Sequence, residues 1–209
     1  VAKVLYGEVS PYSATRLERY SACAFAHFLQ YGLKLTERAE YEFRAMDMGN
    51  IMHKVLESLI KEVNKEKLSL AELSEEERDA LADRLVDEIS ADYGNTILKS
   101  SARNEYMIQR TKRMVRRTVW AIQKQLKSGE FEPEGVEVVF QGGRIDRVDT
   151  METDDGKLYV RVIDYKTGNT SFDLVSLYHG LQLQLMIYMD GALTVEQNKH
   201  KNKEVIPAG

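Results

Sequence analysis

The chain has 209 residues, enough for one domain with a sizeable core or for one domain that carries a helical insert. Hydrophobic residues make up 43% and charged residues 30%, as in ordinary globular proteins, so disordered and fibrous classes are excluded. The single cysteine, Cys23, excludes an internal disulfide and fits a reducing compartment. No apolar run approaches the roughly 20 residues of a spanning helix, and the first residues do not resemble the basic-then-apolar start of a signal peptide. We therefore expect a soluble cytoplasmic protein without a membrane partner.

Helices dominate the first 130 residues, after a short strand expected at 1–6. Ser13 is a favourable N-cap, and Ser74 with Glu77 forms a capping box, so both serines mark helix starts. The polar residues 33–46 predict a loop, and Gly129 predicts the end of the last helix in this part. We expect helices at 13–31, 49–63, 74–93 and 103–127.

The pattern changes to strands after residue 130. Alternating apolar residues and β-branched stretches predict three strands, and Asp154-Asp155-Gly156 is a hairpin turn signal between the second and third. The residues after Gly168 return to a helical pattern that is apolar on most sides, so this helix is expected to be largely buried. We expect strands at 136–140, 144–151 and 158–166, and the final helix at 175–194.

Charge is distributed unevenly along the helical part, although the formal net charge is only -4. Between residues 62 and 92, acidic residues outnumber basic ones eleven to four, which we interpret as a solvated helix face. Between residues 99 and 120, seven basic residues accompany a single acidic one. Arg110, Arg113 and Arg117 recur on one side of this second stretch at helical spacing. The trio is either a solvated face or the footprint of a polyanion site.

Two aspartates mark the expected hairpin. A turn at the Asp-Asp-Gly sequence makes the numbers of paired residues sum to about 310, so Asp146 falls opposite Asp164, with Lys166 on the same face. Facing carboxylates destabilise a ladder unless something neutralises them, and hard cations such as Mg²⁺ take oxygen ligands. The alternative is a pair of edge aspartates satisfied by Arg144 or Arg147. The apolar residues before Asp164 are those of a central strand, which favours the cation.

Further polar side chains lie on two of the expected helices. His53 is at the margin of an apolar stripe, either as a boundary residue or as a group that faces the hairpin. Gln184 and Tyr188 are four residues apart and therefore share a face of the last helix. They form either a buried hydrogen-bonded pair or a contact with substrate near the sheet.

Four sequence blocks in this order resemble the nuclease domain of the RecB-like branch of the PD-(D/E)XK superfamily. The blocks are Gly49 to His53, Gly143 to Arg147, Ile163 to Gly168, and Gln184 to Tyr188. The opening stretch, from Leu5 to Phe28, is similar to the B subunits of AddAB (RexAB) helicase–nucleases, so the resemblance covers nearly the whole chain. It implies an α/β, restriction-endonuclease-like PD-(D/E)XK core, a small mixed sheet flanked by helices, with a helical N-terminal insertion.

The resemblance also implies roles for individual residues. His53, Asp146 and Asp164, with the backbone carbonyl of Tyr165, match the family's ligands for Mg²⁺ or Mn²⁺. Asp146, Asp164 and Lys166 match the catalytic set, in which the lysine positions the attacking water or neutralises charge that builds on the phosphate. Such a site provides the Lewis acid and the positive charge that phosphodiester hydrolysis requires.

Other positions match features outside this set. Gln184 and Tyr188 match a glutamine–tyrosine motif associated with organising the site and contacting DNA. Glu137 resembles an acidic position of some relatives. The arginine trio of the basic stretch is expected to hold phosphates of the DNA strand, a contact that is independent of sequence.

The function implied is a metal-dependent DNA exonuclease domain that degrades the 5′-ended strand during double-strand-break processing for recombinational repair. Its expected partners are single-stranded DNA from unwound duplex ends and the A subunit of the same helicase–nuclease complex, in the bacterial cytoplasm. No Walker motif is present, so ATP hydrolysis is assigned elsewhere. The alternatives are a DNA-holding or assembly module that is inactive in truncated form, and a CRISPR-associated nuclease with the same motifs.

The chain departs from the family pattern in two respects. Family members hold an iron–sulfur cluster through one early and three later cysteines, whereas this chain has Cys23 alone, so we expect the cluster only in a full-length member. The family's core also adds a strand after the last helix, which we expect to lie beyond Gly209. We interpret both ends of the chain as cuts within a larger polypeptide. We expect one nuclease domain at 1–209, divided into a mainly helical part at 1–130, a hairpin core with its helix at 131–195, and a truncated tail at 196–209.

Overall fold

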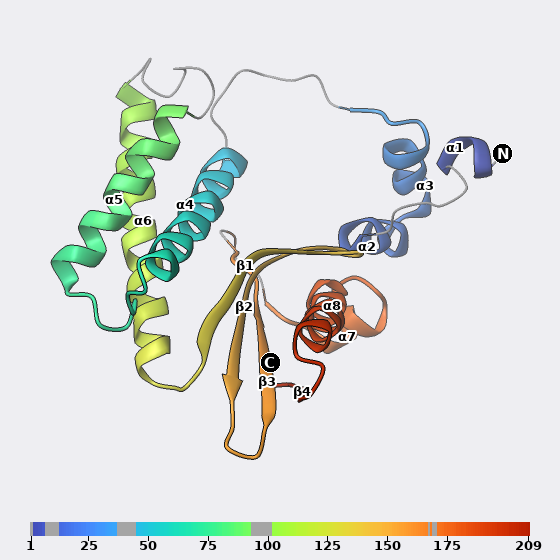
Figure 1. Cartoon of the computed structure of the whole chain (residues 1–209). Coiled ribbons are helices and arrows are strands. Elements are labelled where there is room, and N and C mark those ends of the chain that lie inside the picture. The colour runs from blue at the N-terminus through green and yellow to red at the C-terminus, as the bar shows by residue number, and fades with distance from the viewer. Residues whose placement is uncertain (1, 7–12, 37–44, 93–101, 167, 169–170) are drawn as a thin grey trace. The chain divides into compact units, whose positions relative to one another are not determined.

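The structure is a computed structural model that describes the chain except for residues 1, 7–12, 37–44, 93–101, 167 and 169–170 (Figure 1). The chain divides into two compact units, which we call the helical unit and the sheet unit. The helical unit comprises residues 41–136, and the sheet unit comprises residues 1–40 and 137–209. Among the described residues, none of the helices combines the length and hydropathy that crossing a bilayer requires.

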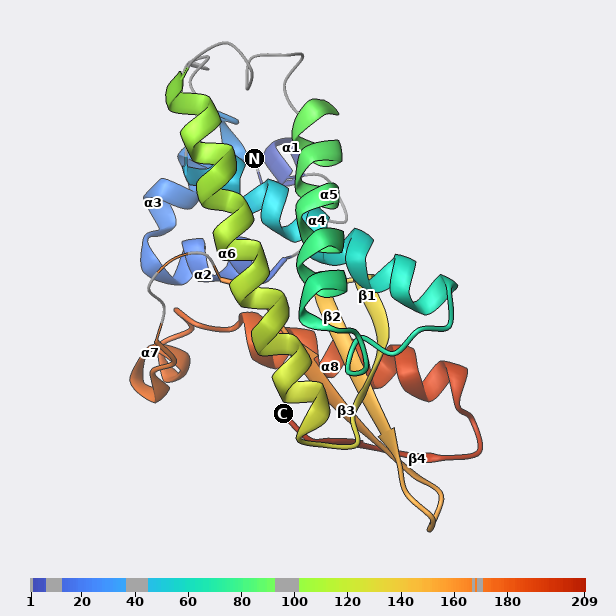
Figure 2. The same ribbon diagram turned by 90° about the vertical axis from the view of Figure 1, so that its left-hand side faces the viewer.

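Three long helices pack against one another in the helical unit (Figure 2). They are α4 (Ala45–Lys65), α5 (Glu75–Asp92) and α6 (Ala102–Lys127), close to the bounds predicted from apolar periodicity. Each helix has a stripe of buried apolar side chains. The largest of these are Ile51, Val55, Leu56, Leu59 and Ile60 of α4, Val86 of α5, and Val115 and Val119 of α6. Apolar burial at helical spacing is therefore what holds this unit together.

Polar contacts fix the start and the register of α5. The predicted capping box is present, because the Ser74 amide donates to Glu77 Oε2 at 2.9 Å and the Glu77 amide donates to Ser74 Oγ at 3.2 Å. Two ion pairs join α5 to α6. Lys112 Nζ lies 2.6 Å from Asp87 Oδ2, and Arg116 Nε donates to Asp83 Oδ1 at 2.7 Å. The acidic stretch is thus partly an ion-paired face between helices, which corrects its interpretation as a solvated face alone.

The sheet unit is built on four strands in the order β1-β2-β3-β4. The strands are β1 (Glu132–Phe140), of which residues 137–140 belong to this unit, β2 (Gly143–Glu152), β3 (Lys157–Ile163) and β4 (Glu204–Pro207). β2 and β3 form the predicted hairpin in the predicted register, with Val148 opposite Val162 and Arg147 opposite Ile163. β3 stops three residues earlier than expected, so residues 164–166 follow the strand instead of continuing it.

The fourth strand corrects the prediction that the strand after the last helix lies beyond Gly209, because residues 204–207 form it. β4 runs parallel to β3, with Leu158 beside Val205 and Tyr159 beside Ile206. The backbone contact continues past β4, because the Ala208 amide donates to the Val160 carbonyl at 2.8 Å. A four-residue strand after a lysine-rich turn is too short to be recognised by its apolar alternation. Its place becomes visible only beside β3.

The N-terminal segment is helical but broken. Residues expected as a strand form α1 (Ala2–Tyr6), and the helix expected at 13–31 is divided into α2 (Ala14–Ala22), α3 (Ala24–His27) and the π-helical turn η1 (Phe28–Gly32). Ser13 caps α2 as predicted, since its Oγ accepts from the Arg16 amide at 3.3 Å. The break falls at Cys23, which has an extended backbone with φ -163° and ψ 107°. Apolar periodicity continues across such a break and does not reveal it. The loop predicted at 33–46 falls largely outside the described residues.

The last helix is also two helices, α7 (Leu174–Tyr178) and α8 (Gln184–Lys199). Gly180, with φ +72°, turns the chain between them into a conformation that favours glycine. α8 packs on β2, β3 and β4 (Figure 1). Leu185 and Met186 at its start are exposed, so the expectation of a largely buried helix is wrong. The middle of α8 meets the sheet core through Ala192, and Tyr188, Met189 and Leu193 pack against that core.

A close helix–strand contact sets α8 on the sheet. Gly191 of α8 is buried, and a Cβ atom at this position would approach ring carbons of Phe140 in β1 to 2.4–2.7 Å. The same ring packs edge-on against Tyr188, with ring centroids 5.7 Å apart. Because Gly191 has no side chain, α8 can lie close to the Phe140 ring of β1, and Tyr188 then packs against the same ring.

Replacing Gly191 by alanine is expected to lower the free energy of unfolding by about 1–3 kcal/mol, because the Phe140 ring or α8 must move. Urea unfolding followed by circular dichroism measures this loss. Gly129→Ala is the matched control, since a Cβ there meets nothing within 4 Å and is expected to change stability by only a few tenths of a kcal/mol. Equal stability of Gly191→Ala and the unaltered chain would contradict the packing argument.

Candidate active site

The candidate site lies where β2 and β3 meet the start of α8. Carried one residue past Arg147–Ile163, the observed register sets Asp146 opposite Asp164, as the sequence predicts. Asp164 directly follows β3, and its side chain is only 7% exposed. The Tyr165 amide donates to Asp146 Oδ2 at 2.7 Å, a bond that orients the first carboxylate and turns the chain away from the strand.

Lys166 and Gln184 complete a closed set of contacts around Asp164. Lys166 Nζ lies 2.6 Å from Asp164 Oδ2 and donates to Gln184 Oε1 at 2.7 Å. Gln184 Nε2 in turn donates to Asp164 Oδ1 at 2.9 Å. Both oxygens of the carboxylate are therefore engaged, one by an ammonium and the other by an amide. The lysine side chain remains 44% exposed, so its charge also faces solvent at the edge of the site.

Tyr188 lies one turn beyond Gln184 on the same face of α8. Burial raises the pKa of its hydroxyl, against a lowering by hydrogen bonding to Gln184, and the negative charges of Asp164 and Asp146 raise it further. The hydroxyl is therefore neutral at pH 7 and available as a hydrogen-bond donor. The structure places both members of the Gln184–Tyr188 pair beside the carboxylates, with a hydrogen bond between them.

Glu137 brings a third carboxylate to this edge of the sheet. One of its oxygens lies within 4.8 Å of an oxygen of Asp146, and Arg144 forms an ion pair with it. Its backbone has φ +52°, a left-handed conformation that costs a non-glycine residue about 1–3 kcal/mol. Backbone strain of this kind concentrates at functional sites, which supports a functional role for the Glu137 carboxylate.

A buried polar network anchors Tyr165 and with it the backbone that holds Asp146. Arg147 is fully buried and binds Asp149 through two hydrogen bonds of 2.7 and 2.8 Å, while its third nitrogen donates to the Tyr165 hydroxyl at 3.0 Å. Arg161 adds a bond of 2.8 Å to Asp149. Burial raises the pKa of the Tyr165 hydroxyl, so it stays neutral and accepts the bond from Arg147. Arg147 is thus engaged with Asp149 and Tyr165, and Arg144 with Glu137.

The start of α8 is held by a residue from the opposite end of the chain. Glu18 of α2 accepts bonds from the Leu183 amide at 2.7 Å and the Gln184 amide at 3.0 Å, both through Oε1. It therefore satisfies amides that the first turn of a helix leaves open, and it places a negative charge at a helix N-terminus. Sequence reasoning did not assign this role, since no local pattern connects positions 165 residues apart.

The remaining candidate residues lie in the helical unit. His53 is half-buried on α4, and Arg110, Arg113 and Arg117 are exposed along α6.

The structure brings together Asp146, Asp164, Tyr165, Lys166, Gln184 and Tyr188 within the sheet unit. Their carboxylate, carbonyl and amide oxygens are the donors that hard divalent cations take. In the structure, the Lys166 ammonium provides the positive charge beside Asp164. The donor set therefore fits a divalent cation.

The fold and this arrangement of polar groups are of the PD-(D/E)XK type. A family model described as the PD-(D/E)XK nuclease superfamily matches residues 11–209, and the chain belongs to this superfamily. The mixed four-stranded sheet flanked by helices and the resemblance of the four sequence blocks are thereby confirmed.

Curated relatives share similarity along all or most of the chain. It is 48% identical to the B subunit of an ATP-dependent helicase/deoxyribonuclease from Lachnoclostridium phytofermentans, with 100% of this chain and 19% of the relative covered. Proteins of the same name from Alkaliphilus metalliredigens and Caldanaerobacter subterraneus are 37% and 41% identical, over 100% and 91% of this chain and 20% and 18% of theirs. The chain thus spans about a fifth of the length of these relatives.

Replacing Glu18 by alanine is expected to lower the free energy of unfolding by about 0.5–2 kcal/mol, as for the loss of a helix cap, because two amides of α8 lose their acceptor. Urea unfolding measures the loss, and hydrogen exchange locates it at the first turn of α8. Glu130→Ala, which removes an exposed carboxylate in the helical unit, is the control and is expected to change little. Unchanged exchange of the Leu183 and Gln184 amides in Glu18→Ala would refute the assigned cap.

Proposed function

We propose that the chain is a DNA nuclease domain that hydrolyses phosphodiester bonds at the site formed by Asp146, Asp164 and Lys166. The observation that carries the proposal is the closed arrangement of these groups with Gln184, in a chain that belongs to a nuclease superfamily. Similarity to deoxyribonuclease subunits along its whole length supports DNA as the substrate.

The proposed cation is Mg²⁺ or Mn²⁺, held by Asp146, Asp164 and the carbonyl of Tyr165. His53 is proposed as a further ligand, on the strength of its place in the first of the four sequence blocks. When bound, such an ion supplies the Lewis acidity that phosphodiester hydrolysis uses. Glu137, whose carboxylate approaches that of Asp146, is the remaining candidate ligand in the sheet unit.

The chain's own groups have separate tasks in this mechanism. Lys166 carries a positive charge at the edge of the site and stabilises negative charge that develops on the phosphate. Gln184 holds Lys166 and Asp164 in fixed relation, because its amide contacts both. Tyr188, kept neutral by burial, donates a hydrogen bond to an anionic oxygen of the bound strand. These groups are positioned before substrate binds, which lowers the reorganisation that the reaction requires.

The wider role is proposed from the relatives. A domain of a bacterial helicase–nuclease would act on single strands from unwound duplex ends, together with an A subunit, in the cytoplasm. Degradation of the 5′-ended strand in double-strand-break repair, and an iron–sulfur cluster in the longer protein, belong to the same proposal. The relatives are named as subunits, and this naming supports a partner subunit.

The exposed arginines of α6 are proposed to hold DNA phosphates. Lys112 and Arg116 of the same helix are taken up by Asp87 and Asp83 of α5. Arg110, Arg113 and Arg117 lie on the exposed face instead. Basic side chains that are held in one direction along a helix and face solvent are suited to a polyanion.

Metal-dependent cleavage tests the proposed function. The chain is expected to nick single-stranded DNA with Mg²⁺ or Mn²⁺, and both Asp164→Ala and Lys166→Ala are expected to lower the rate at least about 100-fold. They should differ in metal affinity, which calorimetry measures. Asp164→Ala removes a ligand and weakens binding, whereas Lys166→Ala leaves the ligands in place and slows the chemical step.

Asp190→Ala is the matched control, because Asp190 is an exposed aspartate on α8 of the same unit. It should cleave at the rate of the unaltered chain. Equal metal affinity of Asp164→Ala and the unaltered chain would refute the ligand assignment. A chain that binds single strands but never cuts them with either metal would instead support the alternative of a DNA-holding or assembly module.

Salt dependence tests the arginine surface of α6. Each phosphate contact releases counterions, so the log–log slope of single-strand affinity against salt is about −0.7 per contact. Replacing Arg110, Arg113 and Arg117 by glutamate is expected to flatten this slope by roughly two units, equally for all DNA sequences. Cleavage at saturating DNA should change little, because the trio holds ground state and transition state alike.

Binding is measured in Ca²⁺ to suppress cleavage. The control reverses three exposed lysines of the same unit, Lys61, Lys65 and Lys67, and so changes the net charge by the same amount. The control should keep the slope of the unaltered chain. If the arginine variant keeps it as well, α6 is a solvated face and the DNA path lies elsewhere.

A further inference from the structure

We propose that the open pocket beside Asp164 and Lys166 binds the base of a nucleotide next to the scissile phosphate, with Phe172 as its stacking surface. The inference rests on the proposed nuclease function and identifies the part of the DNA that this side of the site receives. It concerns the segment between Ser171 and Leu185, which contains α7 and the start of α8.

The pocket has a volume of about 560 Å³, within the range of small-ligand sites. Its lining divides into two chemical sets. Asp164, Lys166 and Gln184 contribute the polar groups of the candidate active site. Phe172, Leu181 and Leu185 contribute apolar surface. A nucleotide combines the same two characters, a charged phosphate and a flat, largely apolar base, so the lining matches a nucleotide in contact with both sets.

Phe172 presents its ring to solvent, being 53% exposed. Leu181 and Leu185 beside it are also exposed, so apolar surface gathers next to a charged site. Exposed apolar surface of this kind marks a place where a partner binds. An aromatic ring suits a nucleobase, because every base has a π-face and stacking is tolerant of sequence.

The Phe172 segment is held on both sides. The side-chain amide of Gln182 accepts from the Asp173 amide at 2.8 Å and donates to the Ser171 carbonyl at 2.9 Å. Asp173 also caps α7 by accepting from the amides of Val175 and Ser176. The backbone before and after Phe172 is therefore tied in place. A positioned ring loses less freedom when a base stacks on it, which favours binding.

The electrostatics of the pocket favour a base over a second phosphate. Besides Asp164, the lining includes the carboxylate of Glu18, which caps α8. The side of the lining formed by Glu18, Phe172 and Leu185 carries a carboxylate and no cationic side chain, so a second phosphate there would be repelled. The uncharged part of a nucleotide meets no such penalty. Lys166, between the carboxylate of Asp164 and solvent, remains the group that meets the scissile phosphate.

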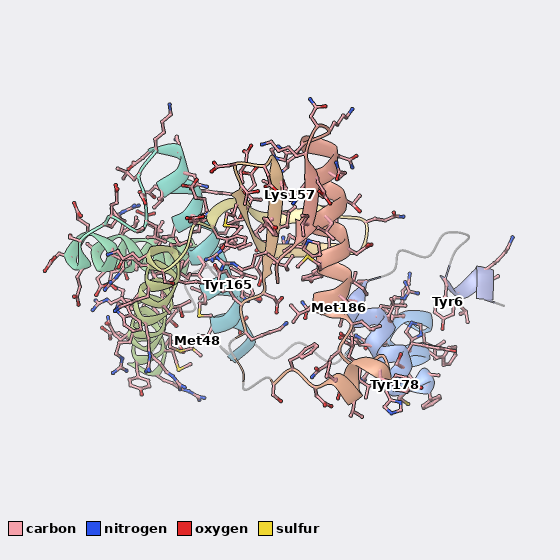
Figure 3. The ribbon with its side chains drawn as sticks, turned by 90° about the horizontal axis from the view of Figure 1, so that it is seen from below. Tyr6, Met48, Lys157, Tyr165, Tyr178 and Met186 are labelled. Atoms are coloured by element: carbon pink, nitrogen blue, oxygen red, sulfur yellow. The ribbon has the colours of Figure 1, made fainter. Side chains whose placement is uncertain are left out.

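The test uses three substitutions of one exposed side chain in the 209-residue chain. Phe172→Ala removes the ring, Phe172→Leu keeps an apolar group without a π-face, and Phe172→Trp keeps the stacking surface. Tyr178→Ala is the control, because Tyr178 is an aromatic residue on α7 that is 86% exposed and lies outside the lining of the pocket (Figure 3). Binding of fluorescent single strands is measured in Ca²⁺, and cleavage is measured in Mg²⁺.

Stacking of a base is worth about 1–3 kcal/mol, so Phe172→Ala and Phe172→Leu are expected to weaken binding roughly 5- to 150-fold. Phe172→Trp and Tyr178→Ala should bind like the unaltered chain. An abasic residue, placed in turn at each position of the strand, should weaken binding by a similar factor at one position beside the cleaved bond. The same abasic strand should cost Phe172→Ala nothing further, because both changes remove the same contact.

The outcomes separate this inference from the proposed function. If Phe172→Ala binds and cuts intact strands like the unaltered chain, the base site is wrong and the nuclease function stands. Equal binding by Phe172→Leu and the unaltered chain would also overturn stacking. Failure of the unaltered chain to cut DNA with Mg²⁺ or Mn²⁺ overturns the nuclease function, and the binding measurements in Ca²⁺ still decide the base site.

Discussion

Two carboxylates that face each other, one within β2 and the other directly after β3, set the main constraint on the sheet unit. Asp146 and Asp164 face the same side because side chains alternate along β2 and β3 in their observed register. Like charges in this position repel, so the fold must supply positive charge or hydrogen-bond donors. The Tyr165 amide serves Asp146, while Lys166 and Gln184 serve Asp164. β3 ends at Ile163, and the residues that directly follow it include two of these donors, the Tyr165 amide and the Lys166 ammonium.

The rest of the sheet unit keeps those donors in place. On one side, the buried Arg147–Asp149 pair binds the Tyr165 hydroxyl and so fixes the backbone that contacts Asp146. On the other side, α8 carries Gln184 and Tyr188, and it is located by Gly191 against the Phe140 ring and by Glu18 at its first turn. An ion pair that is fully buried needs hydrogen bonds to offset its desolvation, and Asp149 receives them from both Arg147 and Arg161. A buried salt bridge thus serves here to orient a backbone amide.

The helical unit divides its charges between structure and surface. Acidic residues of α5 bind Lys112 and Arg116 of α6, which joins the two helices along one side. The remaining arginines of α6 stay exposed at helical spacing. The net charge of the whole chain conceals this arrangement, because the acidic stretch and the basic stretch nearly cancel in the sum. A weakly acidic protein therefore presents a locally basic helix face.

Short-range patterns were sufficient for much of the fold and for the centre of the candidate site. The apolar stripes, the Ser74–Glu77 capping box and the turn that sets the β2–β3 register depend on neighbours a few residues apart, so the sequence determined them. The structure alone decided the breaks at Cys23 and Gly180, the place of β4 and the cap that Glu18 provides. These features depend on contacts between distant segments. A backbone kink or a long-range acceptor leaves no periodic trace in the sequence, because its energy is realised only when the folded chain brings the partners together.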